Sequence, residues 1–108
     1  MFVDRSDEGF VETAPGVRLR VLAHGDATLM AEFRLTAGHE LPAHAHPHEQ
    51  TGYLLSGRIR LHIGDDSREL QPGDSWCVPG GVEHRADIHE DSVAVEVWSP
   101  VREDLLGR

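Results

Sequence analysis

One short stretch of the sequence concentrates side chains that can bind a metal ion. Four of the eight histidines lie within ten residues, and His44, His46 and Gln50 follow one another at intervals of two and four positions. On a β-strand, side chains separated by an even number of positions share a face, so all three would point the same way. Neutral imidazole is a common ligand of transition metals, and two imidazoles at this spacing can reach one ion. The stretch therefore predicts part of a metal site.

A third ligand must come from elsewhere, and the identity of the fourth is open. His84 is the candidate third ligand because the glycine-rich residues before it could turn the chain back toward the first strand. For the fourth, strand alternation favours Gln50, whereas a bulge at Pro47 would bring Glu49 round instead. Three imidazoles with an amide oxygen leave the charge of the ion uncompensated and make a stronger Lewis acid than a shell with a carboxylate. Such ligands accept Zn, Ni, Fe, Mn or Co, and we expect one divalent transition metal per chain.

These side chains must be positioned by β-strands, because the hydrophobic pattern alternates with a two-residue period through most of the chain. Glycines and prolines separate the apolar runs at the spacing expected of a sandwich or barrel. The expected strands are residues 17–23, 29–37, 53–57 leading into 58–64, 75–79 and 92–98. A helix is expected only near the end, with Ser99 as its cap and Pro100 in its first turn. The fold class is therefore all-β, with an edge or swapped strand in the first dozen residues.

The composition restricts the class of partner. A chain of 108 residues fits one domain, and its formal net charge of -9 argues against binding to nucleic acid or to an anionic membrane. A small-molecule substrate is expected instead. No apolar run approaches the ~20 residues that span a bilayer, and the start of the chain lacks a signal-peptide pattern. Cys77 is the single cysteine, which agrees with a reducing compartment, so we expect a cytoplasmic protein.

Residues 38–57 and 73–84 resemble the two signature motifs of the cupin superfamily in the spacing of their glycine, histidine and proline residues. The resemblance implies a single cupin domain over residues 1–108, with a metal-binding core at about residues 38–98. The implied architecture is a jelly-roll barrel (a double-stranded β-helix) with a short C-terminal helical turn. The implied ligands are His44, His46 and His84, with the residue at the position where most cupins have glutamate.

The last expected strand carries an acid and an aromatic residue on one face. Valines alternate with Glu96 and Trp98, and Arg102 follows four residues after the strand. Facing a cavity, these residues would suit a carboxylated sugar, because indole stacks on the ring, guanidinium clamps the carboxylate and glutamate transfers protons. The alternative is that the valines fill the barrel while Glu96 and Trp98 lie outside, in a dimer interface. Tyr53 could also face the cavity.

Residues 44–64, 73–84 and 90–104 together resemble the KdgF cupins of pectin degradation. That family takes the unsaturated monouronates released by pectate and alginate lyases and promotes ring opening to a linear keto acid. The resemblance implies ketonisation of 4,5-unsaturated monouronates by a Lewis-acid metal and an acid–base carboxylate. The metal site it implies is His44, His46, Gln50 and His84. Its acid, aromatic and arginine fall on Glu96, Trp98 and Arg102, where the usual pattern is aspartate, phenylalanine and arginine. We therefore expect Glu96 and Arg102 to be catalytic, and Trp98 and Tyr53 to bind substrate.

Two other functions remain open at this point. A cupin loaded with Fe(II) could be a dioxygenase that acts on a small enediol or dicarbonyl. A cupin that binds a small acid without turnover would be a ligand-binding module. A homodimer is expected in each case, because a short sandwich has exposed edges that need covering. The segment before Arg18 is the part expected to cross over to the partner.

Overall fold

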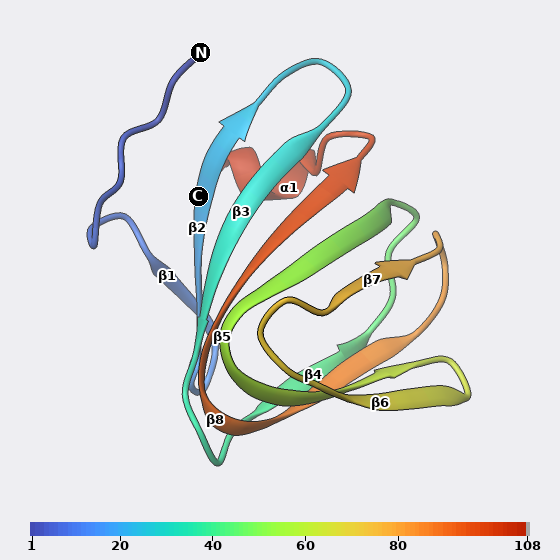
Figure 1. Ribbon diagram of the computed structural model, residues 1–108. Helices are drawn as coiled ribbons and strands as arrows, with labels where there is room; N and C mark the ends of the chain where they lie inside the picture. Colours follow the sequence, from blue (N-terminus) through green and yellow to red (C-terminus); the bar gives the residue numbers. More distant parts are fainter. Residues whose placement is uncertain (108) are drawn as a thin grey trace.

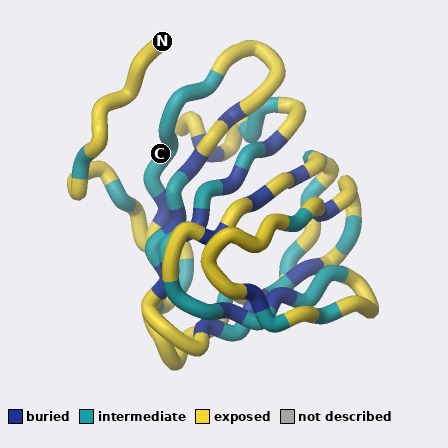
Figure 2. Tube along the Cα trace, in the orientation of Figure 1, coloured by how far each residue is buried: buried dark blue, intermediate teal, exposed yellow. Residues whose placement is uncertain are grey.

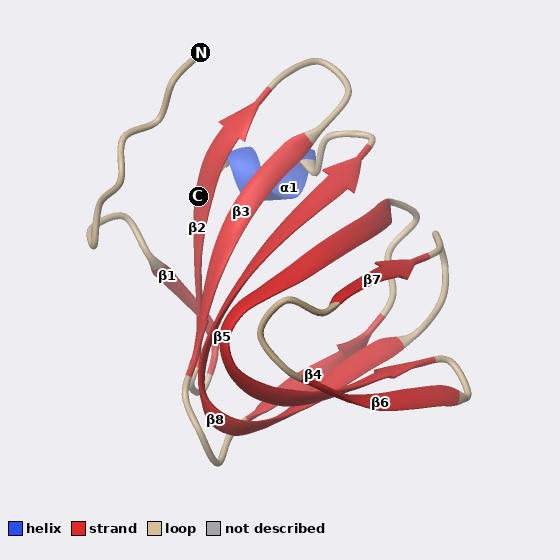
Figure 3. Ribbon diagram, viewed as in Figure 1, coloured by secondary structure: helices blue, strands red, loops and turns tan. Residues whose placement is uncertain are grey.

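The computed structural model describes residues 1–107, which form eight strands and one short helix (Figure 1). The strands are β1 (Val11–Ala14), β2 (Val17–His24), β3 (Leu29–Leu35), β4 (Glu40–His44), β5 (Glu49–Ile63), β6 (Asp66–Leu70), β7 (Ser75–Val78) and β8 (His84–Ser99), followed by helix α1 (Glu103–Leu106). The all-β fold class and the short C-terminal helix are thus confirmed (Figure 3).

Strands β5 and β8 are long and pair with each other along most of their length. Both bend, so the sheet folds over into two facing layers (Figures 1 and 3). In the first layer, β3 pairs with residues 92–98 of β8 and β7 pairs with residues 50–53 of β5. In the second layer, β4 pairs with residues 84–87 of β8 and β6 pairs with residues 59–63 of β5. The two layers form a jelly-roll sandwich, and the long strands β5 and β8 each contribute to both layers.

The bend in β5 depends on Gly57. This residue has a φ of 88°, and a Cβ added to it would overlap Ser92 and the backbone of Asp91 on β8. Only glycine combines that backbone conformation with so close an approach. Ser92 completes the corner, because its hydroxyl accepts a hydrogen bond from the Arg58 amide at 3.0 Å and donates one to the Glu90 carbonyl at 2.6 Å.

The core fills the space between the two layers, where alternate residues of the long central strands, such as β3 and β8, are buried (Figure 2). Its members are aliphatic or aromatic side chains that face inward from their strands, together with Leu105 of α1. They are Val17, Leu19, Leu29, Ala31, Phe33, Leu35, Leu54, Ile59, Leu61, Leu70, Ala86, Ile88, Ala94, Trp98 and Leu105.

Three features of the secondary structure differ from the sequence predictions. Two strands were not predicted: β4 contains Pro42, and β6 is mostly polar and follows a two-residue turn at Gly64 and Asp65. The helix begins at Glu103 and not near Ser99, which remains in β8 as the last residue of that strand. Strand pairing therefore outweighs the capping signal of the Ser-Pro pair. The N-terminal segment contributes one edge strand, β1, which pairs with β2.

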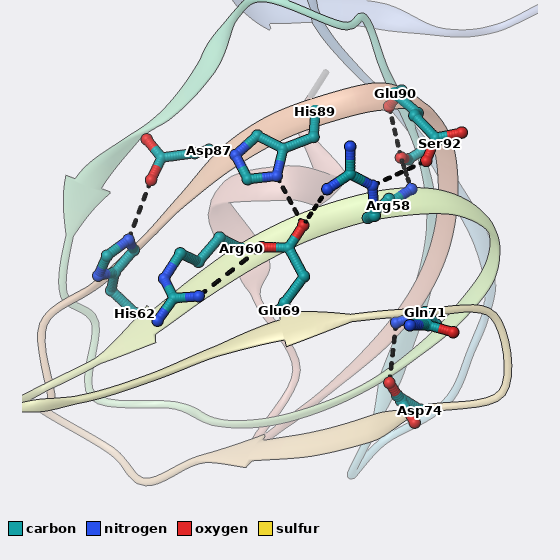
Figure 4. Close-up of polar contacts among 10 residues, drawn as sticks. All are labelled: Arg58, Arg60, His62, Glu69, Gln71, Asp74, Asp87, His89, Glu90 and Ser92. Atoms are coloured by element: carbon teal, nitrogen blue, oxygen red, sulfur yellow. Dashed lines mark hydrogen bonds and ion pairs between the residues drawn. The ribbon is translucent and has the colours of Figure 1, made fainter.

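The outer face of the second layer is covered by paired charges (Figure 4). Arg58 of β5 donates hydrogen bonds to Glu69 of β6 at 2.8 Å and to Glu90 of β8 at 2.9 Å. His62 contacts Asp87 across the same strands at 3.0 Å. Such exposed ion pairs contribute little to stability. Their charged side chains indicate that this face contacts water. No helix in residues 1–107 is both long and apolar enough to cross a membrane.

Candidate metal centre and ligand pocket

Three histidines converge at one end of the sandwich. His44 ends β4 and lies opposite His84, the first residue of β8, in the antiparallel ladder between those strands. His46 follows in the loop before β5 and places its ring 5.0 Å from that of His84, measured between ring centroids. One nitrogen from each ring lies within 4.8 Å of the corresponding nitrogens of the other two. The group could therefore hold one metal ion, as the sequence predicted.

The backbone fixes which nitrogen of each ring faces the centre of the group. In each case Nδ1 contacts the backbone carbonyl oxygen of a residue two positions away, at 2.8 Å for His44, 3.0 Å for His46 and 2.9 Å for His84. A carbonyl only accepts, so each Nδ1 carries the proton and each Nε2 keeps its lone pair. Three lone pairs turned toward one point are the arrangement that a divalent cation requires.

Burial favours the neutral form of two of these imidazoles, His84 and His46. It lowers the pKa of His84 to about 4, and it also lowers the pKa of His46. The Nε2 atom of His84 is buried and has no hydrogen-bond partner among the described residues. An orphaned buried acceptor is costly unless something binds it. A cation fits this position, since it would engage the lone pair directly.

Gln50 is the candidate fourth donor. Its side chain is buried at 3% exposure, and its Oε1 lies 2.8 Å from His46 Nε2. Because His46 keeps its proton on Nδ1, these two facing atoms are both acceptors, and no hydrogen atom lies between them to bind. A cation held by both atoms would resolve this conflict. The residues present thus fit a divalent transition metal with three imidazole ligands and one amide oxygen.

Glu49 points away from the histidines. It is exposed, and the Cys77 thiol contacts its carboxylate at 3.8 Å on the outer side of β5 and β7. Pro47 does not produce the bulge that would reverse the alternation, so Gln50 and not Glu49 faces the cluster. The carboxylate and partial removal from water together raise the pKa of the Cys77 thiol, with removal from water the larger cause.

A pocket of about 230 Å³ lies beside the histidines, between the two layers. Strands β1 to β4 and helix α1 supply its apolar walls, and its polar side chains are Thr13, His44, Gln50, Glu96, Trp98 and Arg102. The inward residues of β8 are therefore the acid and the indole, while the valines between them point outward. This settles the alternative left open by the sequence, in which the valines would have filled the barrel.

Among the described residues, Glu96 is the only carboxylate that lines this pocket, and it is 7% exposed. Burial raises its pKa to about 7, against opposing effects of the Gln50 amide, the Trp76 indole and the Arg102 charge. The Trp76 indole can approach Glu96 because Gly52 lies between them. Gly52 of β5 pairs with Trp76 of β7 on one side and with Glu96 of β8 on the other, and the Trp76 ring lies across it. A Cβ at Gly52 would overlap the indole. The sequence analysis missed this contact, which depends on pairing between distant strands.

Arg102 lies at the pocket but already binds a carboxylate. Its guanidinium carbon is 5.2 Å from the centre of the Trp98 ring, in a cation–π contact. Its Nη2 and Nε donate to the two carboxylate oxygens of Asp104 at 2.6 and 3.2 Å. This is the bidentate geometry in which arginine recognises carboxylates. A carboxylated ligand would therefore compete with Asp104 for the same guanidinium.

Tyr53 does not line this pocket. It is 50% exposed on the outer face of β5, where residues 51, 53 and 55 alternate with the buried side of the strand. The expectation that Tyr53 faces the cavity is therefore wrong. Strand parity explains the error, since Tyr53 lies an odd number of positions from Gln50, which faces inward.

The comparison with protein families agrees with the fold and with the histidine cluster. The model described as "Cupin domain" matches residues 31–100, which include all four donors of the candidate metal centre. The chain belongs to the cupin family.

The cupin is also similar to two proteins that carry the KdgF name. The pectin degradation protein KdgF of Dickeya dadantii (strain 3937) is 25% identical over 107 residues, which cover 97% of this chain and 96% of that protein. The solved structure of KdgF from Halomonas sp. superposes with a TM-score of 0.91 at 26% identity, covering 97% of this chain and 99% of the other. The resemblance noted in the sequence thus extends to the whole fold.

A third relative has a less specific description. The crystal structure of an RmlC-like cupin from Shewanella frigidimarina NCIMB 400 superposes with a TM-score of 0.90 at 25% identity. The match covers 96% of this chain and 94% of that protein. A nearly identical fold therefore occurs in a protein whose description names no reaction. The function of this cupin must be argued from its site and not from the fold alone.

Proposed function

We propose that this cupin opens the ring of 4,5-unsaturated monouronates and releases the linear keto acid. The observation that carries the proposal is Glu96, a buried carboxylate with a pKa raised to about 7 by burial, in a pocket that it shares with Gln50 of the candidate metal centre. A proton carrier is most effective when its pKa is near the working pH. The similarity to a pectin degradation protein supports this class of substrate.

The reaction needs one proton to move and no oxidant. A base removes the proton from the anomeric hydroxyl, C1=O forms, and the bond between C1 and the ring oxygen breaks. The ring oxygen becomes the C5 ketone as the C4=C5 electron pair takes up a proton at C4. Glu96 would accept the first proton and return it to C4, so a single carboxylate serves both steps. Such acid–base assistance is worth about 10²- to 10⁴-fold in rate.

Other residues would hold the substrate. His44, His46, His84 and Gln50 would hold the metal. When bound, that ion would supply Lewis-acid polarisation of a substrate oxygen, worth several kcal/mol. Arg102 would exchange Asp104 for the substrate carboxylate, and the Trp98 indole beneath the guanidinium would restrict where that carboxylate can lie. The buried walls around Glu96 would exclude water from the proton that it carries.

The test uses purified protein loaded with Zn, Ni, Mn, Co or Fe(II) and an unsaturated monouronate prepared with a lyase. Loss of the ultraviolet absorbance of the conjugated double bond and appearance of the open-chain keto acid by NMR would support the proposal. If the Fe(II)-loaded protein instead consumes oxygen in the presence of an enediol or dicarbonyl, the dioxygenase alternative would replace the proposed ring opening. Saturable binding of the uronate without product would instead identify a ligand-binding cupin.

We also propose that the cupin forms a homodimer through the outer face of its first layer. This surface, here called the valine face, consists of Met30, Tyr53, Leu55, Val93, Val95 and Val97. All six side chains are uncharged in a chain whose net charge is -9, and the neighbouring Glu32 is paired with Arg34 at 3.0 Å, so two copies can meet there with little repulsion between like charges. The opposite outer face carries the ion pairs of Figure 4 and offers no comparable surface.

The N-terminal segment borders the valine face and supports a second copy as its occupant. Arg20 and Arg34, which point outward from β2 and β3, donate to the Asp4 carbonyl at 3.0 Å and to the Asp7 carboxylate at 2.9 Å. These contacts hold the segment on the outer side of the layer. Phe2 extends beyond them with a relative exposure of 101%. A fully exposed phenylalanine on a segment that borders an apolar sheet face is what a crossing arm would present to a partner.

Leu55→Asp is expected to convert a dimer into a monomer. A carboxylate on each copy would be desolvated at the centre of the contact, and the two would repel each other. Leu106→Asp on α1 is the matched control, because it makes the same change at 43% exposure, against 49% for Leu55, away from the valine face. Light scattering after gel filtration measures the molar mass. A monomeric wild type, or a Leu55→Asp variant that stays dimeric, would rule out this interface.

A further inference from the structure

Among the described residues, the Trp98 side chain donates one hydrogen bond, and its acceptor is a predicted metal ligand. Its indole Nε1 donates a hydrogen bond to Gln50 Oε1 at 2.9 Å, and both side chains are buried. The two residues lie directly opposite each other in the ladder between β5 and β8. The same oxygen is 2.8 Å from His46 Nε2. One amide oxygen thus faces the indole and the histidine cluster together.

The orientation of the Gln50 amide decides whether it can bind a cation. Its oxygen has lone pairs, whereas its NH₂ group offers only hydrogens, and a half-turn about the last side-chain bond exchanges the two. His46 by itself would favour the wrong orientation. Its Nε2 is an acceptor, because Nδ1 donates to the carbonyl of His48, so a flipped amide would donate an N–H to it. In that orientation the cluster would face a group that cannot coordinate an ion.

The Trp98 indole opposes this flip, in addition to the interaction of the Gln50 amide with the Glu96 carboxylate. Indole Nε1–H is only a donor, so it can face the amide oxygen but would oppose the NH₂ group. The ring has little freedom to move away, since it is 1% exposed and packs against Phe33 with ring centroids 5.9 Å apart. Arg102 lies over the ring at 5.2 Å. A phenylalanine in the same place could fill most of the space but would have no hydrogen to donate.

We infer that Trp98 is a positioning residue for the metal centre, which holds the Gln50 amide with its oxygen toward the histidines and thereby sets the affinity for a divalent cation. The inference concerns the metal site on which the proposed function rests, but it concerns ion binding alone. It assigns Trp98 a role distinct from contact with a sugar. Because the test requires no sugar, a failure of the proposed reaction and a failure of this inference can be told apart.

The first test measures Zn²⁺ affinity by calorimetry or by competition with a chelating dye. Trp98→Phe should weaken binding by about 10- to 100-fold, as loss of a hydrogen bond that orients a ligand commonly does. Tyr53→Phe is the control, since it removes a polar hydrogen from an aromatic ring that is exposed on the outer face of β5, away from Gln50 and the histidines, and it should leave Zn²⁺ affinity unchanged. Equal affinity of wild type and a folded Trp98→Phe variant would overturn the inference.

A second background separates orientation from general loosening of the core. Gln50→Glu replaces the amide by a carboxylate, whose two oxygens are equivalent and need no orientation. Adding Trp98→Phe to Gln50→Glu should therefore cost far less Zn²⁺ affinity than adding it to the wild type. The same loss in both backgrounds would show that Trp98 acts only through packing, and would contradict the proposed role.

NMR of the wild type provides a readout that does not depend on any variant folding. The chain has two tryptophans, so the indole N–H region contains two signals. The Trp98 signal should exchange slowly with solvent, with and without Zn²⁺, and the Gln50 side-chain amide should give one set of resonances. Rapid exchange of that indole proton, or two amide orientations in slow exchange, would overturn the inference even if Trp98→Phe failed to fold.

Discussion

Glu96→Gln should reduce turnover of a 4,5-unsaturated monouronate by about 10²- to 10⁴-fold and leave substrate binding within a few-fold of the wild type. The amide has nearly the shape of the carboxylate and can occupy the same buried position, but it cannot carry a proton from the anomeric hydroxyl to C4. The loss should therefore appear in kcat, with KM little changed. Steady-state kinetics with the ultraviolet signal of the double bond measure both constants.

The matched control is Glu90→Gln on the same strand. Glu90 is exposed on the outer face of the second layer and binds Arg58, so the substitution removes a carboxylate from β8 without touching the pocket. Wild-type kcat in Glu90→Gln, with the loss confined to Glu96→Gln, would assign the proton transfer to Glu96. Full activity of Glu96→Gln would remove the mechanism proposed for the pocket.

The same substitution should stabilise the protein above neutral pH when no metal is bound. The pKa of Glu96 rises from 4.5 to about 7 on folding, so between these values the native state binds a proton that the unfolded state has lost. Stability of the wild type therefore falls as pH rises through this range, by about 3 kcal/mol in total. Glutamine does not titrate, so the difference in unfolding free energy should be small at pH 4.5 and largest above pH 7.

Denaturant unfolding of chelator-treated protein at several pH values measures this difference. The gain in stability and the loss of turnover in one variant would show that the carboxylate is kept in the pocket at the expense of folding, as acid–base groups commonly are. A Glu96→Gln variant as stable as the wild type at pH 8 would mean that the carboxylate is better solvated than its 7% exposure indicates.

The donors of the metal centre followed from the sequence because strand alternation is local. His44, His46 and Gln50 have even spacing, and the structure keeps them on one side despite the loop between β4 and β5. The approach of His84 was predicted from a glycine-rich corner and from the resemblance to the cupin motifs. Its actual cause is the ladder between β4 and β8, which sets it opposite His44.

Which face of β8 points inward could not be decided from the sequence. Valines occupy one parity of the strand, while Ala94, Glu96 and Trp98 occupy the other, so both faces carry enough apolar surface to be buried. The decision depends on which residues of β3 and β5 meet each face. Leu54 and Phe33 lie beside Ala94 on the inner side, and these pairings join segments far apart in the chain. The contact between Arg102 and Asp104 is local, but it forms only after the strand has ended, where no periodic pattern exists.

His84→Ala should abolish binding of a transition metal at the proposed centre, with at least a 10²-fold loss of affinity for Zn²⁺ expected from removal of one of four ligands. The orphaned Nε2 of His84 is the reason for choosing this residue. Elemental analysis of protein purified without a histidine tag should find about one metal per wild-type chain and little in the variant. His62→Ala is the control, because the His62 side chain contacts Asp87 on the outer face and does not belong to the histidine cluster.

Thermal stability should report the same loss. A ligand that binds only the folded state stabilises it by about 4 kcal/mol when its free concentration is about 1,000 times Kd. Zn²⁺ should therefore raise the unfolding temperature of the wild type and of His62→Ala, and a chelator should reverse the rise. His84→Ala should respond to neither addition. The variant also removes a buried acceptor that has no partner among the described residues, so its stability in the absence of metal should equal or exceed that of the wild type. A large destabilisation of the metal-free variant would show that the imidazole is needed for packing and not for binding an ion.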